Sequence, residues 1–343
     1  MTQTREHDHE VAHPTRRSSR GRWLIASIIG IGTLFALRGL TDALELPLPN
    51  QLQDLLTLSI SVIVESLPFV ILGVLLSIVV QQWVPDSWFV RFMPRNRVGR
   101  RIAISFLGVL LPVCECGNVP LARGLMVKGL SVSESMTFLL AAPILNPITI
   151  ITTYQAFGFD GGVLVARIAG GFIIANVIGW MFSKRANEQS LLTDRFAAEC
   201  RVPPTHSHGG TRVRLSLDAF VRELGVIMPA LFIGSLLAGA IQVIVPRSVL
   251  VTFGSNPLWS VLAMMLLAFV ISVCSNVDAF FILPFSNTFM SGSIVSFLVF
   301  GPIVDIKMLS LLRTTFTTPV LVQLTVVVAL LSACIGLLVN YVA

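Results

Sequence analysis

Residues 112–120 read PVCECGNVP and place a thiol on each side of a carboxylate. Cys114 and Cys116 offer soft sulfur ligands, and Glu115 between them can exchange a proton. In a regular helix, residues two positions apart point about 200° from each other, so the two thiols could not share a ligand there. Pro112, Gly117 and Pro120 loosen the backbone, and an unwound turn would let both sulfurs converge. The stretch therefore predicts a binding site at a break in an apolar segment.

The same elements recur later in the chain. CGNV at 116–119 is repeated as CSNV at 274–277, and APILNP at 142–147 is repeated as GPIVDI at 301–306. Pro68, Gly73 and Pro85 return as Pro229, Gly234 and Pro246. This internal repeat would bring two breaks to one central cavity. The candidate substrate-binding residues are Cys114, Cys116, Cys274, Asn118, Asn276, Asn146 and Asp305.

Each candidate also has a structural interpretation. The asparagines and Asp305 could cap broken helices, and a buried cysteine is often a small apolar side chain. We expect Cys200 and Cys334 to be small apolar side chains without a function in binding. Asp305 and Lys307 could simply pair with each other. Glu115 and Glu65 lie in apolar segments, where ionisable residues are costly, and we expect them to couple proton movement to transport.

All five histidines lie in polar segments: His7, His9, His13, His206 and His208. They could bind a metal weakly, and the alternative is a solvated tail and linker.

Composition places these residues in a membrane. Of the 343 residues, 54% are hydrophobic and 12% are charged, and the mean hydropathy is +0.83. The net charge of +6 is best explained by orientation in a bilayer, and we expect no nucleic acid partner. The chain contains no P-loop and no secreted-type cysteine framework. We expect no cofactor.

Segment lengths and arginines predict the topology. A cytoplasmic tail (1–22) precedes an extra transmembrane helix (23–44), a first membrane repeat (52–183), a cytoplasmic linker (184–214) and a second membrane repeat (215–343). Loops 84–101 and 184–214 are rich in arginine, so both face the cytoplasm, and an even number of crossings must separate them. A re-entrant hairpin at 102–130 followed by spans at 132–155 and 161–183 meets this condition.

The second half differs in charge. Loop 247–257 has one arginine, whereas the equivalent loop 84–101 has five, so the two loops should lie on opposite sides. The expected fold is therefore an all-α integral membrane protein with two inverted repeats, each a span, a broken re-entrant hairpin and two spans. The hairpin of the second repeat lies at 257–291 and its spans at 293–313 and 316–341. This arrangement is typical of secondary transporters, although four parallel spans in each half is the alternative. The N-terminus would be cytoplasmic and the C-terminus outside.

The stretch PVCECGNVPLARGLMVKGLSVSESMTFLLAAPILNPIT resembles the predicted permease family that includes trivalent organoarsenical efflux permeases. The similarity extends over 52–341, and its most specific parts are the Cys-Gly-x-x-Pro and Pro-Ile-x-Asn-Pro elements. The resemblance implies a multi-pass permease of the bacterial inner membrane. In some members it implies efflux of thiol-seeking metalloid species. The second half departs from the first, with CSNVDAFF where the first has CGNVPLAR.

Together these observations predict a secondary-type permease, not an enzyme, that exports a thiophilic solute such as a trivalent (organo)arsenical through a midplane site. The alternatives are a permease for a divalent metal such as zinc or for a small sulfur-containing or anionic solute, and a membrane thiol–disulfide enzyme. CxC at membrane depth argues against the enzyme, which would usually carry CxxC. The expected partners are the lipid bilayer and the solute, and a homo-oligomer is compatible with the sequence.

Overall fold

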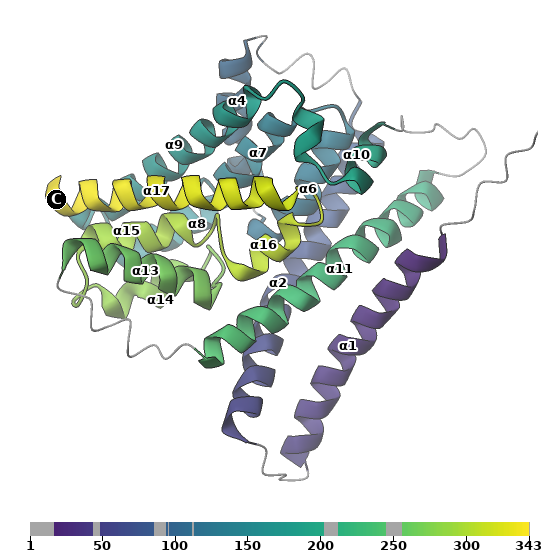
Figure 1. The fold of residues 1–343 in the computed structure, drawn as a ribbon, viewed down its shortest axis with the longest axis horizontal. Coiled ribbons are helices and arrows are strands. Elements are labelled where there is room, and N and C mark those ends of the chain that lie inside the picture. The colour runs from purple at the N-terminus through teal and green to yellow at the C-terminus, as the bar shows by residue number, and fades with distance from the viewer. Residues whose placement is uncertain are drawn as a thin grey trace, which may run out of the picture.

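The computed structural model describes residues 17–43, 49–85, 94, 96–111, 113–201, 212–244 and 256–342. Helices account for nearly all of this part of the chain, and two residues, Leu192 and Phe316, form an isolated antiparallel bridge. The fold is that of an all-α membrane protein, as the sequence predicts (Figure 1). The five histidines and loop 247–255 lie outside the described residues.

Five helices are long and apolar enough to cross a membrane. Most carry large apolar side chains on their outer surfaces, such as Val64 on α2 and Val322 on α17, each more than half exposed. A soluble fold would bury such side chains, whereas lipid accommodates them. The five helices are α1 (Arg17–Ala43), α2 (Asn50–Trp83), α9 (Val163–Ser183), α11 (Arg212–Ile244) and α17 (Thr318–Val342).

Two interrupted helical pairs occupy the positions predicted for hairpins. The first consists of α4 (Arg97–Ser105), α5 (Leu107–Leu110) and, after a break, α6 (Glu115–Val127). The second consists of α13 (Pro257–Ile271) and, after a break, α14 (Asp278–Ile282) with the 3₁₀ turn η3 (Leu283–Phe285). Both breaks fall at the cysteine motifs.

The expected spans 132–155 and 293–313 are not continuous helices. The first divides into α7 (Val132–Ala141) and α8 (Pro147–Phe157), and the second into α15 (Ser291–Phe300) and α16 (Ile306–Leu312). Each interruption contains a proline, Pro143 or Pro302, followed by a polar residue that caps the next helix. The prolines and capping residues that mark these interruptions are visible in the sequence, whereas the apolar composition of both segments predicts unbroken spans.

The helices of the two halves match in order and spacing. Helices α7 and α15 are both ten residues long, and they begin 159 positions apart, as α8 and α16 do. Helix α7 packs on α9 as α15 packs on α17, and α2 packs on α11 between the halves. The interrupted helices also cross between halves, because α8 packs on α14 and α16 packs on α6. Whether the second copy is inverted relative to the first remains a prediction.

Two further elements surround this core. Helix α1 lies at one side of the molecule and packs mainly on α11 (Figure 1). The linker helix α10 (Asp194–Arg201) packs on α6. There the buried guanidinium of Arg123 reaches Glu199 on α10 at 3.1 Å and Glu223 on α11 at 2.6 Å. One arginine of the first hairpin thus joins the linker to the second half.

Candidate functional site

The first break lies between α5 and α6, and the protein satisfies its freed backbone groups. The carbonyl oxygen of Cys114 accepts bonds from the amides of Gly117 and Asn118, which starts α6. The carbonyl oxygen of Val113 accepts from the side-chain amides of Asn118, at 3.4 Å, and Asn146, at 3.1 Å. Backbone that leaves a helix at membrane depth needs such partners. Asn118 and Asn146 therefore stabilise the non-helical backbone at the first break.

The second break follows the same design. The carbonyl oxygen of Cys274 accepts from the amides of Val277 and Asp278, both at 3.0 Å. By this backbone role Cys274 corresponds to Cys114, whereas the sequence repeat pairs it with Cys116. Ser272 begins the break in the left-handed conformation, with φ 53° and ψ 42°, which is unusual for a residue other than glycine. This turn directs the carbonyl oxygen of Ser272 toward Lys307, whose Nζ lies 3.3 Å away.

The two breaks bring three buried thiols together. The sulfur atoms of Cys114 and Cys116 lie within 4.8 Å of each other and of a carboxylate oxygen of Glu115, and the sulfur of Cys274 lies 3.6 Å from Oε2 of the same glutamate. Cys116 also approaches the hydroxyl of Ser66 on α2, with 3.8 Å between sulfur and oxygen. None of these three cysteines forms a disulfide, and each is at most 3% exposed. Two elements far apart in sequence thus contribute sulfur to one point inside the protein.

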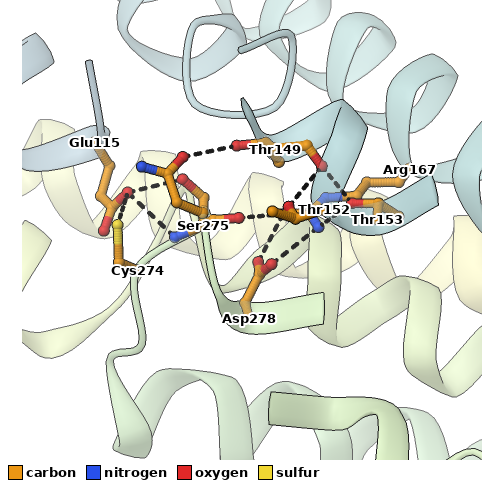
Figure 2. Close-up of polar contacts among 9 residues, drawn as sticks. Glu115, Thr149, Thr152, Thr153, Arg167, Cys274, Ser275 and Asp278 are labelled. Atoms are coloured by element: carbon orange, nitrogen blue, oxygen red, sulfur yellow. Dashed lines mark hydrogen bonds and ion pairs between the residues drawn. The ribbon is translucent and has the colours of Figure 1, made fainter. Parts of the chain in front are cut away.

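Glu115 connects the two breaks. Its Oε2 accepts a 2.9 Å bond from the hydroxyl of Ser275 and lies 3.6 Å from the sulfur of Cys274 (Figure 2). Its Oε1 lies 3.4 Å from Nζ of Lys307 on α16. Both charged residues are at most 1% exposed. Lys307 therefore forms its ion pair with Glu115. The charge of Asp305 also acts on Lys307, but the two residues form no ion pair within 4.0 Å in the described part of the chain.

Asn146 and Asp305 occupy matching cap positions. The side chain of Asn146 accepts from the amide of Ile148 at the start of α8, and that of Asp305 accepts from the amide of Met308 in α16. One side-chain oxygen of Asp305 and the side-chain oxygen of Asn118 are buried without a hydrogen-bond partner among the described residues. Asp305 and Asn118 thus support the breaks structurally, and each still has a side-chain oxygen that could accept a hydrogen bond from a solute.

Glu65 and Asn276 lie at the edges of the cluster. Glu65 is half-buried on α2, close enough to Lys307 and Glu115 for their charges to interact. Asn276 lies within the second break by sequence, and its side chain accepts a 3.2 Å bond from the hydroxyl of Thr149 on α8. The structure thus places the predicted residues at the two breaks or beside them, and the side chain of Asn276 joins the second break to α8.

A second buried charge pair was missed by sequence reasoning. The guanidinium of Arg167 on α9 donates to both carboxylate oxygens of Asp278 on α14, at 2.9 and 2.6 Å. It also donates to the hydroxyl of Thr153 at 2.7 Å and to the carbonyl oxygen of Ser275 at 3.4 Å. Ser275 therefore touches both Glu115 and Arg167, and it links the two charge pairs (Figure 2). Arg167 and Asp278 are ionisable residues in apolar segments, and this signal could have identified them.

The cluster suits a soft ligand. The sulfur atoms of Cys114 and Cys116 and a carboxylate oxygen of Glu115 lie within 4.8 Å of one another. Thiolates bind soft ions and metalloids, and a carboxylate can complete a zinc site. Lys307 neutralises Glu115 and lies beside the thiols. The arrangement can therefore bind a thiophilic solute without enclosing it in an all-thiolate cage.

Comparisons with known proteins agree with this description. A family model described as predicted permease, ArsP_1, matches residues 51–341. The UPF0718 protein YcgR of Bacillus subtilis is 38% identical over 260 residues, which cover 75% of this chain and 87% of that protein. A putative two-component membrane permease complex subunit of Streptococcus mutans is 33% identical over 277 residues, which cover 80% and 91%.

A shorter similarity links the chain to the UPF0718 protein YraQ of Escherichia coli, at 23% identity over 140 residues, which cover 41% of this chain and 39% of that protein. No solved structure matches this chain. The family model covers residues 51–341, and the Bacillus and Streptococcus relatives match 75% and 80% of the chain. The chain therefore belongs to the ArsP_1 family of predicted permeases, and it is a multi-pass membrane permease.

Proposed function

We propose that this permease exports a thiophilic solute, such as a trivalent (organo)arsenical, through the site where the two broken hairpins meet. The observation that carries this proposal is that Cys114, Cys116 and Cys274, from separate halves of the chain, are grouped around Glu115. Trivalent arsenic and thiols form a matched soft pair. A site shared between two halves can also change its ligand geometry when the halves move, which would allow release.

The charges distinguish between solutes. Lys307 lies beside the thiols, so an entering divalent cation would meet a like charge in a low-dielectric environment. A neutral arsenical would meet no such repulsion. The second candidate, a divalent metal such as zinc, is favoured by the close grouping of Cys114, Glu115 and Cys116. Zinc would require Lys307 to move away from Glu115.

We also propose that Glu115 or Glu65 couples proton movement to transport. Glu115 contacts a thiol, a hydroxyl and an ammonium group, so its protonation would weaken its hold on both hairpins. Glu115→Gln and Glu65→Gln should each be tested for the dependence of transport on pH. If both variants keep the wild-type pH profile, Asp305 becomes the next candidate.

Location and assembly are part of the same proposal. We place the protein in the bacterial inner membrane, with its N-terminus in the cytoplasm and its C-terminus outside. A homo-oligomer is compatible with this arrangement. One relative is described as a subunit of a two-component complex, so a second protein component should also be sought by affinity purification from membranes.

The decisive experiment is uptake of phenylarsenite into inverted membrane vesicles. Replacing any of the three clustered cysteines by serine should lower uptake by about tenfold or more, the scale of loss when a metal site is perturbed. Cys200→Ser and Cys334→Ser are the matched controls and should be silent. Wild-type uptake in the triple serine variant, at equal expression, would refute sulfur coordination. Parallel uptake of Zn²⁺ would identify the second candidate.

A further inference from the structure

A cleft of about 220 Å³ lies away from the thiol site, between the start of α4, the start of α7 and the end of α9. Arg97, Arg100 and Arg101 line it from α4. Their spacing of three and four residues places them on one side of that helix. Hydroxyl groups of Ser131, Ser133 and Ser183 complete the polar wall. The hydroxyl groups of Ser133 and Ser183 already donate to Glu188 and to the carbonyl oxygen of Trp180, so the guanidinium groups are the donors that would bind a phosphate in this cleft.

The acidic residues of the cleft already have other partners. Glu134 lies 3.0 Å from Nε of Arg100 and caps α7 through the amide of Ser131. Glu188 accepts from the amide and hydroxyl of Ser133, at 3.0 and 3.1 Å. Arg101 is buried and donates to Ser183 at 2.9 Å. Arg97 has no ion-pair partner among the described residues, so the three arginines exceed the two glutamates by one positive charge.

The surroundings of the cleft indicate a lipid. Helices α4 and α9 run antiparallel away from it, as the contacts Arg101–Ser183 and then Ser105–Asn176 show. Beyond the cleft their outer faces are apolar: Ile102, Phe106 and Trp180 are each 40% exposed or more. Trp180 lies one turn from Ser183, and tryptophan at this position is typical of the boundary between lipid and water. A phosphate in the cleft would therefore lie at headgroup level, with an apolar track beside it.

We propose that this cleft binds the phosphate of an anionic phospholipid, whose acyl chains follow the exposed faces of α4 and α9. The volume is below the 300–1,000 Å³ that is typical of sites for drug-sized ligands, and it fits a headgroup phosphate better than a nucleotide. Arginines that only served orientation would be solvated, whereas Arg101 is 7% exposed and forms a wall of the cleft. The site is independent of the thiol cluster.

The test is native mass spectrometry of the purified full-length chain in detergent, titrated with phosphatidylglycerol or phosphatidylethanolamine. One phosphatidylglycerol molecule should bind preferentially. Each basic residue contributes about 1 kcal/mol to binding an anionic lipid, so Arg97→Gln should weaken binding roughly fivefold. The double variant Arg97→Gln/Arg100→Gln should weaken it roughly 25-fold. Arg97 makes no ion pair in the described chain, so its variant should fold normally.

The matched control is Arg222→Gln/Arg313→Gln, which removes two exposed arginines that do not line the cleft. Equal losses in this control and in the cleft variant would overturn the proposal, as would equal binding of the two lipids. A third arm adds inorganic phosphate to delipidated protein. Arg97-dependent binding of phosphate without binding of phosphatidylglycerol would overturn the lipid assignment.

Discussion

Glu115 and Lys307 are opposite charges enclosed where lipid and protein leave almost no water. Removing water from a charge raises the free energy of the folded protein. The attraction between the two groups, whose Nζ and Oε1 atoms lie 3.4 Å apart, offsets part of that cost. The hydroxyl of Ser275 supplies a further bond to the carboxylate. A single unpaired charge at this position would have no such compensation.

Lys307→Met should therefore destabilise the protein strongly, by about 3–5 kcal/mol, because it leaves Glu115 buried without its partner. The double variant Lys307→Met/Glu115→Gln removes both charges and should recover much of the loss. Thermal unfolding in detergent would measure both variants. Equal destabilisation by the single and double variants would show that the two charges do not compensate each other.

Cys200 provides a prediction about pH outside the membrane helices. Desolvation of its half-buried thiol on α10 raises the pKa from 9.0 to about 11, and the nearby Arg123 opposes only part of that effect. The protonated thiol is unreactive, so alkylation by iodoacetamide at pH 8 should be about 100-fold slower than for a thiol at the ordinary value. The rate should rise as the pH approaches 11.

The control for this measurement is the unfolded chain, in which Cys200 should react at the ordinary rate. A quadruple serine variant that retains Cys200 alone would isolate its signal from those of the other four cysteines. Fast alkylation of the folded protein at pH 8 would contradict the assigned burial.

At the scale of elements, a close approach between α2 and α6 positions the first break. A Cβ added at Gly73 would clash with the backbone of Gly117, and one added at Gly117 would meet the backbone of Phe69. Two glycines therefore let the helices pack backbone to backbone, as small residues do in membrane proteins. This contact fixes the depth of α6, and with it the positions of Cys114 and Cys116.

Gly73→Ala should destabilise the protein by about 1–3 kcal/mol, because the backbone of Gly117 cannot move aside as a flexible side chain could. It should also lower transport by displacing α6. Gly32→Ala on α1 is the control: no neighbouring atom of the described chain lies within 4 Å of the added methyl group, so stability should be unchanged or slightly higher. Thermal unfolding of the two variants gives the comparison, and equal melting temperatures would exclude a tight α2–α6 contact.

At the scale of the whole molecule, the remaining prediction is orientation. The contrast in arginine content between loops 84–101 and 247–257 predicts that the second repeat is inverted. Alkaline phosphatase fused after Ser255 or after Ala343 should then be active, since both positions would lie outside. A fusion within the linker 202–211 should be inactive. A cytoplasmic signal at Ser255 or Ala343 would eliminate the inverted arrangement.

The class of the protein, the order of its segments and the position of both breaks could be predicted from the amino-acid sequence. Hydropathy is a local property, and proline, glycine and polar residues mark interruptions wherever they occur in an apolar run. The repeated motifs also identified the cysteines, asparagines and Asp305 as neighbours of the breaks. The division of 132–155 and 293–313 into shorter helices was missed, because the apolar composition outweighed the capping signals of Asn146 and Asp305.

The pairing of the buried charges depends on the packing of distant helices and could not be predicted from the sequence. Lys307 lies two residues from Asp305 but pairs with Glu115, which is 192 positions away. Arg167 and Asp278, 111 positions apart, form the second pair. No local pattern specifies such partners, because pairing depends on how α9, α14 and α16 pack against the first break. The thiol cluster has the same origin: Cys274 lies 3.6 Å from the carboxylate of Glu115, 159 positions away, because the interrupted helices of the two halves pack on each other.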